Sequence, residues 1–340
     1  MHARWKSRRV MSSVIALLVS GALIALAGTA SATPLGSHAS KQVKKQFVVA
    51  DVTEPLAVQY WDWVNWGIEH VAKQEGVKVV IFDDHSDVSQ QIEETKTAIA
   101  QKVDGIILSP NNSPEAAAVL ALAAKAHIPV VQAFIGSGGK GTYASFVTSA
   151  DLQQGRAVGA YTRKLLGGKG ELVCACLQLT RANAQAKLKG MKQTLGSGIK
   201  IVQIEQGKTY TIAETEQQVK DMLTAHPTAA VFAQYGDAAL GAVAAVKALG
   251  KVPGKDVKIV VTDGGPTEVA DVVKGEINAD SVQQASGGGQ KAMELMLNIL
   301  HGRTVPHEVD LPEPVITKQN YAKMVGWMNG HIWPPGTKTG

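Results

Sequence analysis

Aromatic side chains are scarce in this chain of 340 residues, where phenylalanine, tyrosine and tryptophan together make up 5%. The segment "VQYWDWVNWG" (58–67) is the exception, because it holds Tyr60, Trp61, Trp63 and Trp66. The remaining tryptophans lie near the two ends of the chain, at Trp5, Trp327 and Trp333. Such a local cluster indicates either densely packed core or a set of rings that faces a ligand.

Cysteine is rarer still, since the chain has only Cys174 and Cys176, in the segment "ELVCACLQ". This count excludes a small fold held together by several disulfides. The segment is typical of a strand, on which residues two apart share a face with Cα atoms near the upper limit for an unstrained disulfide. Two residues also supply too few ligands for a metal. We interpret the pair as two small buried apolar residues.

Common signatures of catalysis are missing as well. No serine has glycine two positions away on both sides, and no H-E-x-x-H motif occurs. The stretch "GSGGKG" (136–141) matches the dinucleotide pattern G-x-G-x-x-G, but "TYASFV" follows it. That segment is typical of a strand, whereas the dinucleotide pattern requires a helix at this place. We interpret the glycines as a turn, and we expect neither an enzyme nor a bound cofactor.

One acidic cluster, "DDHSD" (83–87), could suggest a metal site because it places carboxylates around His85. Acidic residues between a strand and a helix more commonly form a solvated turn and the N-cap of the helix. The N-cap is then Asp87 or Ser89, and no metal is expected.

Positive charge is largely confined to the N-terminus. Residues 1–32 contain four basic residues, all before Val10, and no acidic residue. An apolar run from Val10 to Leu26 follows the basic residues and precedes the small residues Ala30 to Ala32. This pattern is typical of a secretory signal peptide cut after Ala32, and the apolar run is short for a membrane anchor. Cleavage lowers the formal net charge from +5 to +1. No basic surface for nucleic acid is therefore expected.

The rest of the chain alternates short apolar runs with amphipathic stretches. The runs "QFVVADV", "VKVVIFD", "DGIILSP" and "IPVVQAF" are typical of buried parallel strands, and a second series follows with "ELVCACLQ", "IKIVQIE", "AAVFAQ" and "VKIVVTD". Helices of the second series are expected to begin near Ala182, Ile212, Asp237 and Pro266. The chain is therefore predicted to form two doubly wound α/β units, with "VTSAD" (147–151) between them. Ligands bind beyond the carboxyl ends of such strands.

Three segments, 104–131, 223–246 and 257–275, resemble the ribose-type family of periplasmic solute-binding proteins, which feed ABC importers. The resemblance extends from about Lys44 to Val315. It implies the type I periplasmic binding fold, in which two Rossmann-like lobes are joined by a hinge of three crossing strands.

The resemblance also implies how the chain divides. The N-terminal lobe would comprise residues 44–148 plus 284–310, and the C-terminal lobe residues 149–283 plus 311–340. The second crossing would fall near Gln283 and the third between Val309 and Pro314. The tail 321–340 extends beyond the usual end of the family, and we expect its tryptophans to dock on the second lobe.

Several ligand-binding positions carry over by this resemblance. Tyr60 and Trp61 stand where the family places rings that sandwich a sugar, and Tyr210 stands at another aromatic position. Asp263 matches a polar anchor, and Gln283 matches a hinge glutamine that reaches the ligand.

Other family positions are changed. Lys187 stands in place of an arginine clamp, and Tyr235 in place of an asparagine. Phe134 and Ile135 replace an Asp-Arg pair that commonly grips pyranose hydroxyls. The expected site is therefore richer in aromatic rings and poorer in hydrogen-bonding groups than that of a typical sugar binder.

The aromatic cluster fits this expectation only in part. A helix over 59–75 would bury one stripe made of Trp61, Val64, Ile68 and Val71. Its first turn would let Tyr60 and Trp61 line the cleft, while Trp63 and Trp66 pack elsewhere. The alternative is that all four rings belong to the core.

The sequence thus predicts a monomeric periplasmic receptor that binds a small sugar or polyol and delivers it to an inner-membrane ABC permease. The string "YWDWVNWG" also resembles periplasmic sensors of methylated amines and amine oxides, for which rings and a carboxylate form a box. The alternative function is therefore a sensor subunit of a membrane histidine kinase.

Overall fold

The computed structural model describes residues 46–85 and 87–338. The predicted signal peptide, residues 1–32, lies outside them. Within the described residues, no helix has the length and apolar character needed to cross a membrane.

The described chain forms two sheets. The first sheet contains, in order across it, β11 (Glu308–Asp310), β5 (Ser145–Thr148), β4 (Val130–Ala133), β3 (Gly105–Leu108), β1 (Val48–Thr53) and β2 (Lys78–Asp83). The second contains β12 (Val315–Ile316), β10 (Ala279–Ser281), β9 (Lys258–Val261), β8 (Ala230–Ala233), β6 (Gly170–Cys176) and β7 (Ile199–Gln206). All pairings are parallel except that of β10 with β12. Parallel pairing places the carboxyl ends of the strands at one edge of each sheet.

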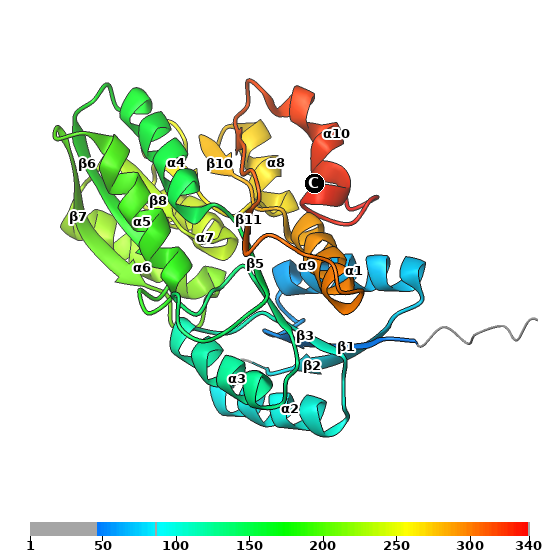
Figure 1. Cartoon of the computed structure of the whole chain (residues 1–340). Helices are drawn as coiled ribbons and strands as arrows, with labels where there is room; N and C mark the ends of the chain where they lie inside the picture. Colours follow the sequence, from blue (N-terminus) through cyan, green and yellow to red (C-terminus); the bar gives the residue numbers. More distant parts are fainter. Residues whose placement is uncertain (1–45, 86, 339–340) are drawn as a thin grey trace, which may run out of the picture. The chain divides into compact units, whose positions relative to one another are not determined.

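Helices cover these sheets in pairs (Figure 1). On the first sheet, α1 (Gln59–Glu75) packs against α9 (Ala285–Leu300), and α2 (Val88–Ala100) packs against α3 (Ser113–Lys125). On the second sheet, α4 (Asp151–Leu165) packs against α5 (Ala182–Leu195), and α6 (Ile212–Ala225) packs against α7 (Gly236–Ala248). The shorter α8 (Pro266–Lys274) contacts β10 and α7.

Local signals in the sequence explain where these helices begin and end. The predicted helix 59–75 has the bounds of α1, and it ends because Gly76 takes the left-handed conformation with a φ of 70°. The side chain of Asp87 caps α2 by accepting hydrogen bonds from the amides of Ser89 and Gln90. This confirms the N-cap interpretation of the acidic cluster.

The glycine-rich stretch 136–141 is a turn, as predicted. Gly138, Gly139 and Gly141 have positive φ values, and β5 follows them rather than a helix.

The chain passes between the two sheets in three places within the described residues. It leaves β5 of the first sheet for α4, which packs with α5 on the second. It returns after β10 into α9, which contacts β3, β4 and β5 of the first sheet. The third passage lies between β11 and β12, over residues 311–314.

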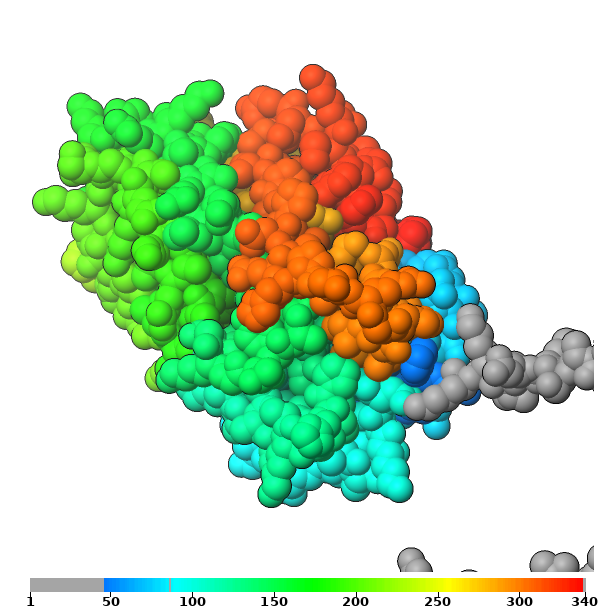
Figure 2. Space-filling view, in the orientation of Figure 1, coloured from blue at the N-terminus to red at the C-terminus, as the bar shows by residue number. Residues whose placement is uncertain are grey.

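The tail differs from the expected assignment. The indole of Trp333 is fully buried and lies 6.1 Å from the ring of Trp63 in α1 of the first lobe. Gln290 in α9 donates to the carbonyl of Gly330, and α10 (Tyr321–His331) contacts α9. Figure 2 shows the tail in red against the orange and blue parts of the chain. The tail therefore packs on α1 and α9 of the first lobe, whereas we expected it on the second lobe.

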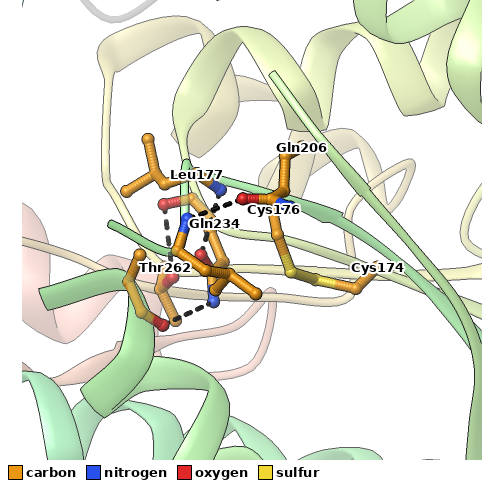
Figure 3. Close-up of a disulfide and its surroundings, with 8 residues drawn as sticks. Cys174, Cys176, Leu177, Gln206, Gln234 and Thr262 are labelled. Carbon is orange, nitrogen blue, oxygen red and sulfur yellow. Dashed lines mark hydrogen bonds between the residues drawn. A yellow bond between two sulfur atoms is a disulfide. The ribbon is translucent and has the colours of Figure 1, made fainter. Parts of the chain in front are cut away.

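The two cysteines also differ from expectation. Cys174 and Cys176, both fully buried in β6, form a disulfide beside Gln234 and Leu177 (Figure 3). Their Cα atoms are 5.5 Å apart, within the usual range for a disulfide. That separation is shorter than two steps of a regular strand, about 6.6 Å, and so the bond can form between residues two apart.

Candidate functional site

Three rings at the carboxyl edge of the first sheet contact one another. Tyr60 and Trp61 come from the first turn of α1, and Phe134 directly follows β4. The ring of Tyr60 lies 4.9 Å from that of Trp61 and 5.4 Å from that of Phe134, both edge to face. Ile135, which follows Phe134, is buried as well. Tyr60 and Trp61, to which the family resemblance assigns sugar stacking, therefore lie against Phe134, which replaces a polar residue of the family.

The second lobe supplies another aromatic pair. Tyr210 lies just before α6 and Tyr235 just before α7, and their rings are 5.3 Å apart, edge to face. The hydroxyl of Tyr235 lies 3.0 Å from that of Thr215 in α6. Burial raises the pKa of Tyr235 to about 12, so this hydroxyl stays protonated.

Polar side chains join the two sheets between these aromatic groups. Asp263 follows β9, and its Oδ2 atom accepts a hydrogen bond of 2.6 Å from the amide of Gly236. With its side-chain amide oriented to match its neighbours, Gln283 donates to Asp263 Oδ1 (3.1 Å) and accepts from Lys187 Nζ (3.2 Å) and Ser149 Oγ (3.1 Å). Ser149 follows β5 of the first sheet, so the hinge glutamine links the strand ends of both lobes.

Lys187 is held by the protein itself. Its side chain is almost fully buried, and its ammonium donates to the carbonyl of Thr262 at 3.2 Å. The nearest carboxylate oxygen, Asp151 Oδ1, is 3.9 Å away. The ammonium therefore balances the charge of buried carboxylates and donates to Gln283, and the clamp on the ligand that the resemblance implies stays a prediction.

An ion pair that the sequence analysis missed joins the lobes directly. Glu54 follows β1 of the first sheet, and Arg181 precedes α5 of the second. Arg181 Nη1 and Nη2 donate to Glu54 Oε1 and Oε2 at 3.2 and 3.1 Å, and both side chains are about nine-tenths buried. The Trp61 indole also hydrogen-bonds this carboxylate, and the guanidinium lies 5.5 Å from the centre of the Tyr210 ring.

Burial raises the pKa of Glu54, and the charge of Arg181 opposes that increase. The two residues could have been found from the sequence, because Glu54 directly follows a predicted strand and Arg181 lies in the stretch after Leu179. Nothing local, however, predicts that they pair, since they are 127 residues apart.

Carboxyl groups are crowded on the second-lobe side of the site. Burial is the largest cause of a raised pKa for five of them, and it brings Asp151 to about 6 and both Glu268 and Asp280 to about 8. The other two are Asp263 and Glu313. The positive charge of Lys187 opposes the increase for four members of the group, namely Asp151, Asp263, Asp280 and Glu313.

The remaining tryptophans of the cluster contact other parts of the protein. Trp63 packs on Trp333 of the tail, and the ring of Trp66 stacks on His70 at 4.7 Å. Trp63 and Trp66 therefore pack elsewhere, as predicted, and the role of Tyr60 and Trp61 at the ligand site stays a prediction. Across 46–85 and 87–338, no group of three or more His, Cys, Asp or Glu side chains is arranged to hold a metal ion.

Comparison with known proteins places this arrangement in a family. The model of the periplasmic binding protein domain matches residues 52–304. The chain is 27% identical to the ribose import binding protein of Bacillus subtilis over 278 residues, which cover 81% of this chain and 89% of that protein. It is 29% identical to a putative rhizopine-binding protein of Rhizobium meliloti over 269 residues, which cover 76% of this chain and 86% of that protein.

A solved structure supports the same conclusion for the fold. An ABC transporter solute-binding protein of Bacillus halodurans with bound myo-inositol superposes with a TM-score of 0.77 at 22% identity, covering 83% of this chain and 98% of that one. The predicted fold, two α/β lobes of the type I periplasmic binding class, is therefore confirmed, and the family consists of binding proteins rather than enzymes. The chain belongs to the periplasmic binding protein family.

Proposed function

We propose that the protein is the exported solute receptor of an ABC importer, and that it binds a small sugar or polyol where the strand ends of its two lobes meet. The observation that supports this proposal is the bridge that Gln283 makes between Asp263 of the second lobe and Ser149 of the first, in a chain of this family whose first lobe places aromatic rings at its strand ends. Ring faces suit the C–H surface of a polyhydroxylated molecule, and carboxylate and amide groups suit its hydroxyls. Relatives named for ribose and for galactofuranose support the same ligand class.

The mechanism is a shift between open and closed arrangements of the lobes. A ligand that contacts both lobes shifts the protein towards the closed arrangement only to the extent that it binds that arrangement more tightly than the open one. The closed protein would then present a joint surface of both lobes to an inner-membrane permease. The lobes would comprise 44–148 plus 284–310 and 149–283 plus 311–320, with the tail 321–340 carried by the first.

A thermal-shift screen of the secreted protein tests the ligand class. We expect a sugar or polyol, at about a hundred times its dissociation constant, to stabilise the protein by about 2.7 kcal/mol. The panel should hold ribose, arabinose, galactose and inositol, with methylated amines and amine oxides beside them. If the methylated amines alone raise the melting temperature, the sensor function is correct instead. If no compound does so at millimolar concentration, the receptor proposal is wrong.

Asp263 is the side chain whose removal should weaken binding most directly. We expect Asp263→Ala to lower ligand affinity by about ten- to a hundredfold, because a hydrogen bond to a charged group contributes about 1.5–3 kcal/mol. Asp263→Asn keeps an acceptor for the amide of Gly236 and should lose less. Isothermal titration calorimetry measures both variants.

The control for this experiment is Asp221→Ala, which removes an exposed carboxylate from α6. Its affinity should equal that of the parent protein. If Asp263→Ala and Asp221→Ala bind the ligand with equal affinity, in samples with matched urea unfolding curves, Asp263 does not belong to the ligand site.

A further inference from the structure

The C-terminal tail connects the two lobes by a route separate from the three passages between the sheets. Strand β12 pairs antiparallel with β10 of the second sheet, so it leads away from the passage at 311–314. The chain then turns, and α10 returns to contact α9 of the first lobe (Figure 1). Residues 317–333, which we call the tail strap, therefore join the second lobe at one end to the first lobe at the other.

The beginning of the tail strap is fixed on the second lobe. The side chain of Asn320 accepts a hydrogen bond from the amide of Thr317 at 2.7 Å, and it donates to the carbonyl of Val315 in β12 at 2.8 Å. Lys318 Nζ lies 3.8 Å from the place that a Cβ atom would take at Gly275, the C-cap of α8. This end of the strap is therefore held against β12 and α8, which both belong to the second lobe.

The other end of the tail strap is a compact turn over residues 329–333. The amide of Gly330 donates to the carbonyl of Trp333 at 2.8 Å, and Trp333 Nε1 donates to Asn329 Oδ1 at 3.0 Å. The side chains of Ile332 and Trp333 are almost fully buried. The turn is thus closed by its own hydrogen bonds, and it presents two apolar side chains to the rest of the protein.

This turn is fixed on the first lobe. The side chain of Gln290 in α9 donates to the carbonyl of Gly330 at 3.0 Å. The amide of Ser286 in α9 donates to the carbonyl of Ile332 at 3.3 Å. The indole of Trp333 packs on α1 of the same lobe. Backbone, side-chain and ring contacts therefore all attach the turn to α1 and α9.

The chain between the two attached ends has little spare length. It is helical from Tyr321 to Met328, and only the turn that follows departs from helical geometry. A helix rises 1.5 Å per residue, so these residues span about 12 Å and can lengthen only by unwinding. The strap is attached to α1 and α9 beside the three passages. A rotation of the lobes about the passages therefore changes the distance between its two ends.

We propose that the tail strap limits how far the two lobes open. Its attached ends coexist with the ion pair of Glu54 and Arg181, so they belong to an arrangement in which the lobes touch. Wider opening requires that the turn leave α9 or that α10 unwind, and either change loses hydrogen bonds or buried apolar contacts. The strap thereby keeps more of the unliganded protein near the arrangement that binds, which raises the apparent affinity. The proposal rests on the lobe motion of the proposed function and does not depend on which ligand is bound.

The alternative role of the tail is packing alone. Trp333 covers the ring of Trp63, and a tail that only covers apolar surface would stabilise the first lobe without affecting the separation of the lobes. The two roles differ in what they require of the link between the attached ends. A restraint on opening requires a short link, whereas a cover requires only that the turn 329–333 stays on α1 and α9.

Lengthening the link separates the two roles. Six glycine and serine residues inserted between Asn320 and Tyr321 of the full mature chain add about 13 Å of reach and leave both attached ends intact. We expect a larger radius of gyration without ligand, measured by small-angle X-ray scattering, at an unchanged urea unfolding midpoint. Affinity for whichever of ribose, arabinose, galactose and inositol stabilises the parent protein should fall about fivefold, the lower end of typical coupling between two sites.

The matched control is the same insertion between Arg303 and Thr304, in an exposed connection from α9 to β11 that stays within the first lobe. It should change neither the radius nor the affinity. Trp333→Ala is a second variant, which weakens the attachment to the first lobe without changing the link. It should also enlarge the radius, and it should lower stability because a fully buried ring is removed.

The strap proposal is wrong if the long-link chain and Trp333→Ala both keep the radius of the parent protein. It is also wrong if the insertion at Arg303 enlarges the radius as much as the insertion at Asn320. Both comparisons are made without ligand, so they do not depend on the receptor function, which the thermal-shift panel tests. A sugar that binds a protein of unchanged radius would overturn only the strap. A larger radius in a protein that binds no compound of the panel would support the strap and count against the receptor function.

Discussion

Replacing Arg181 with alanine is expected to destabilise the protein by about 3–5 kcal/mol, because it leaves the buried carboxylate of Glu54 without its counter-charge. The loss includes both hydrogen bonds of the bidentate pair and the contact with the Tyr210 ring. Urea unfolding followed by tryptophan fluorescence measures it, with Trp61 as a reporter next to the pair. Ligand affinity should fall as well, since the pair joins the lobes that the ligand must hold together.

A double-mutant cycle shows whether the loss of stability comes from the pairing of Arg181 with Glu54. Glu54→Gln combined with Arg181→Met removes both charges, and the double variant should recover most of the stability that Arg181→Ala loses. The matched control is Lys96→Ala, which breaks the exposed pair of Lys96 with Glu93 and should leave stability nearly unchanged. If Arg181→Ala is as stable as this control, the ion pair does not hold the lobes together.

The radius of gyration, measured by small-angle X-ray scattering, shows whether the lobes move apart in this variant. We expect the radius of gyration of Arg181→Ala to exceed that of the parent protein without ligand, because the variant loses a direct contact between the lobes. Saturating ligand should compact both proteins. An identical radius for the two unliganded proteins would count against a role of the pair in closure.

Local patterns in the sequence predicted the elements well. The stripe of Trp61, Val64, Ile68 and Val71 is buried in α1, and the helix has the predicted bounds. Helical periodicity, a strand pattern apolar on both faces and a terminal glycine are short-range signals, so they can be read without the rest of the fold.

Contacts between distant segments could not be predicted from such local patterns. Trp333 packs on Trp63 of the first lobe, whereas chain order suggested the second lobe. Glu54 pairs with Arg181 from the other lobe, and Gln283 links Ser149 to Asp263. Each of these contacts depends on how distant parts of the chain approach each other. The periodicity of apolar residues in the sequence carries no information about that approach. The disulfide of β6 was missed for a different reason, because regular strand spacing overestimates the 5.5 Å between its Cα atoms.

The aromatic side of the site depends on how closely α1 and α9 approach each other, and glycine permits that approach. A Cβ atom at Gly289 of α9 would overlap the carbonyl oxygen of Val64, and one at Gly67 of α1 would overlap the carbonyl oxygen of Ser286. Both obstacles are backbone atoms, which can move only if the helices separate. We expect Gly289→Ala to cost about 1–3 kcal/mol of stability, in spite of the higher helix propensity of alanine.

The Gly289→Ala substitution should also weaken ligand binding. Displacing α1 moves Tyr60 and Trp61 away from Phe134 and from the second lobe, so affinity should fall along with stability in Gly289→Ala. Gly326→Ala in α10 is the control, because nothing lies within 4 Å of a Cβ atom there and the substitution should be neutral or slightly stabilising. Urea unfolding and calorimetry of both variants provide the comparison. Equal stability of the two would mean that α1 and α9 can separate freely, and the rings of the first lobe would then not be held in place by this helix pair.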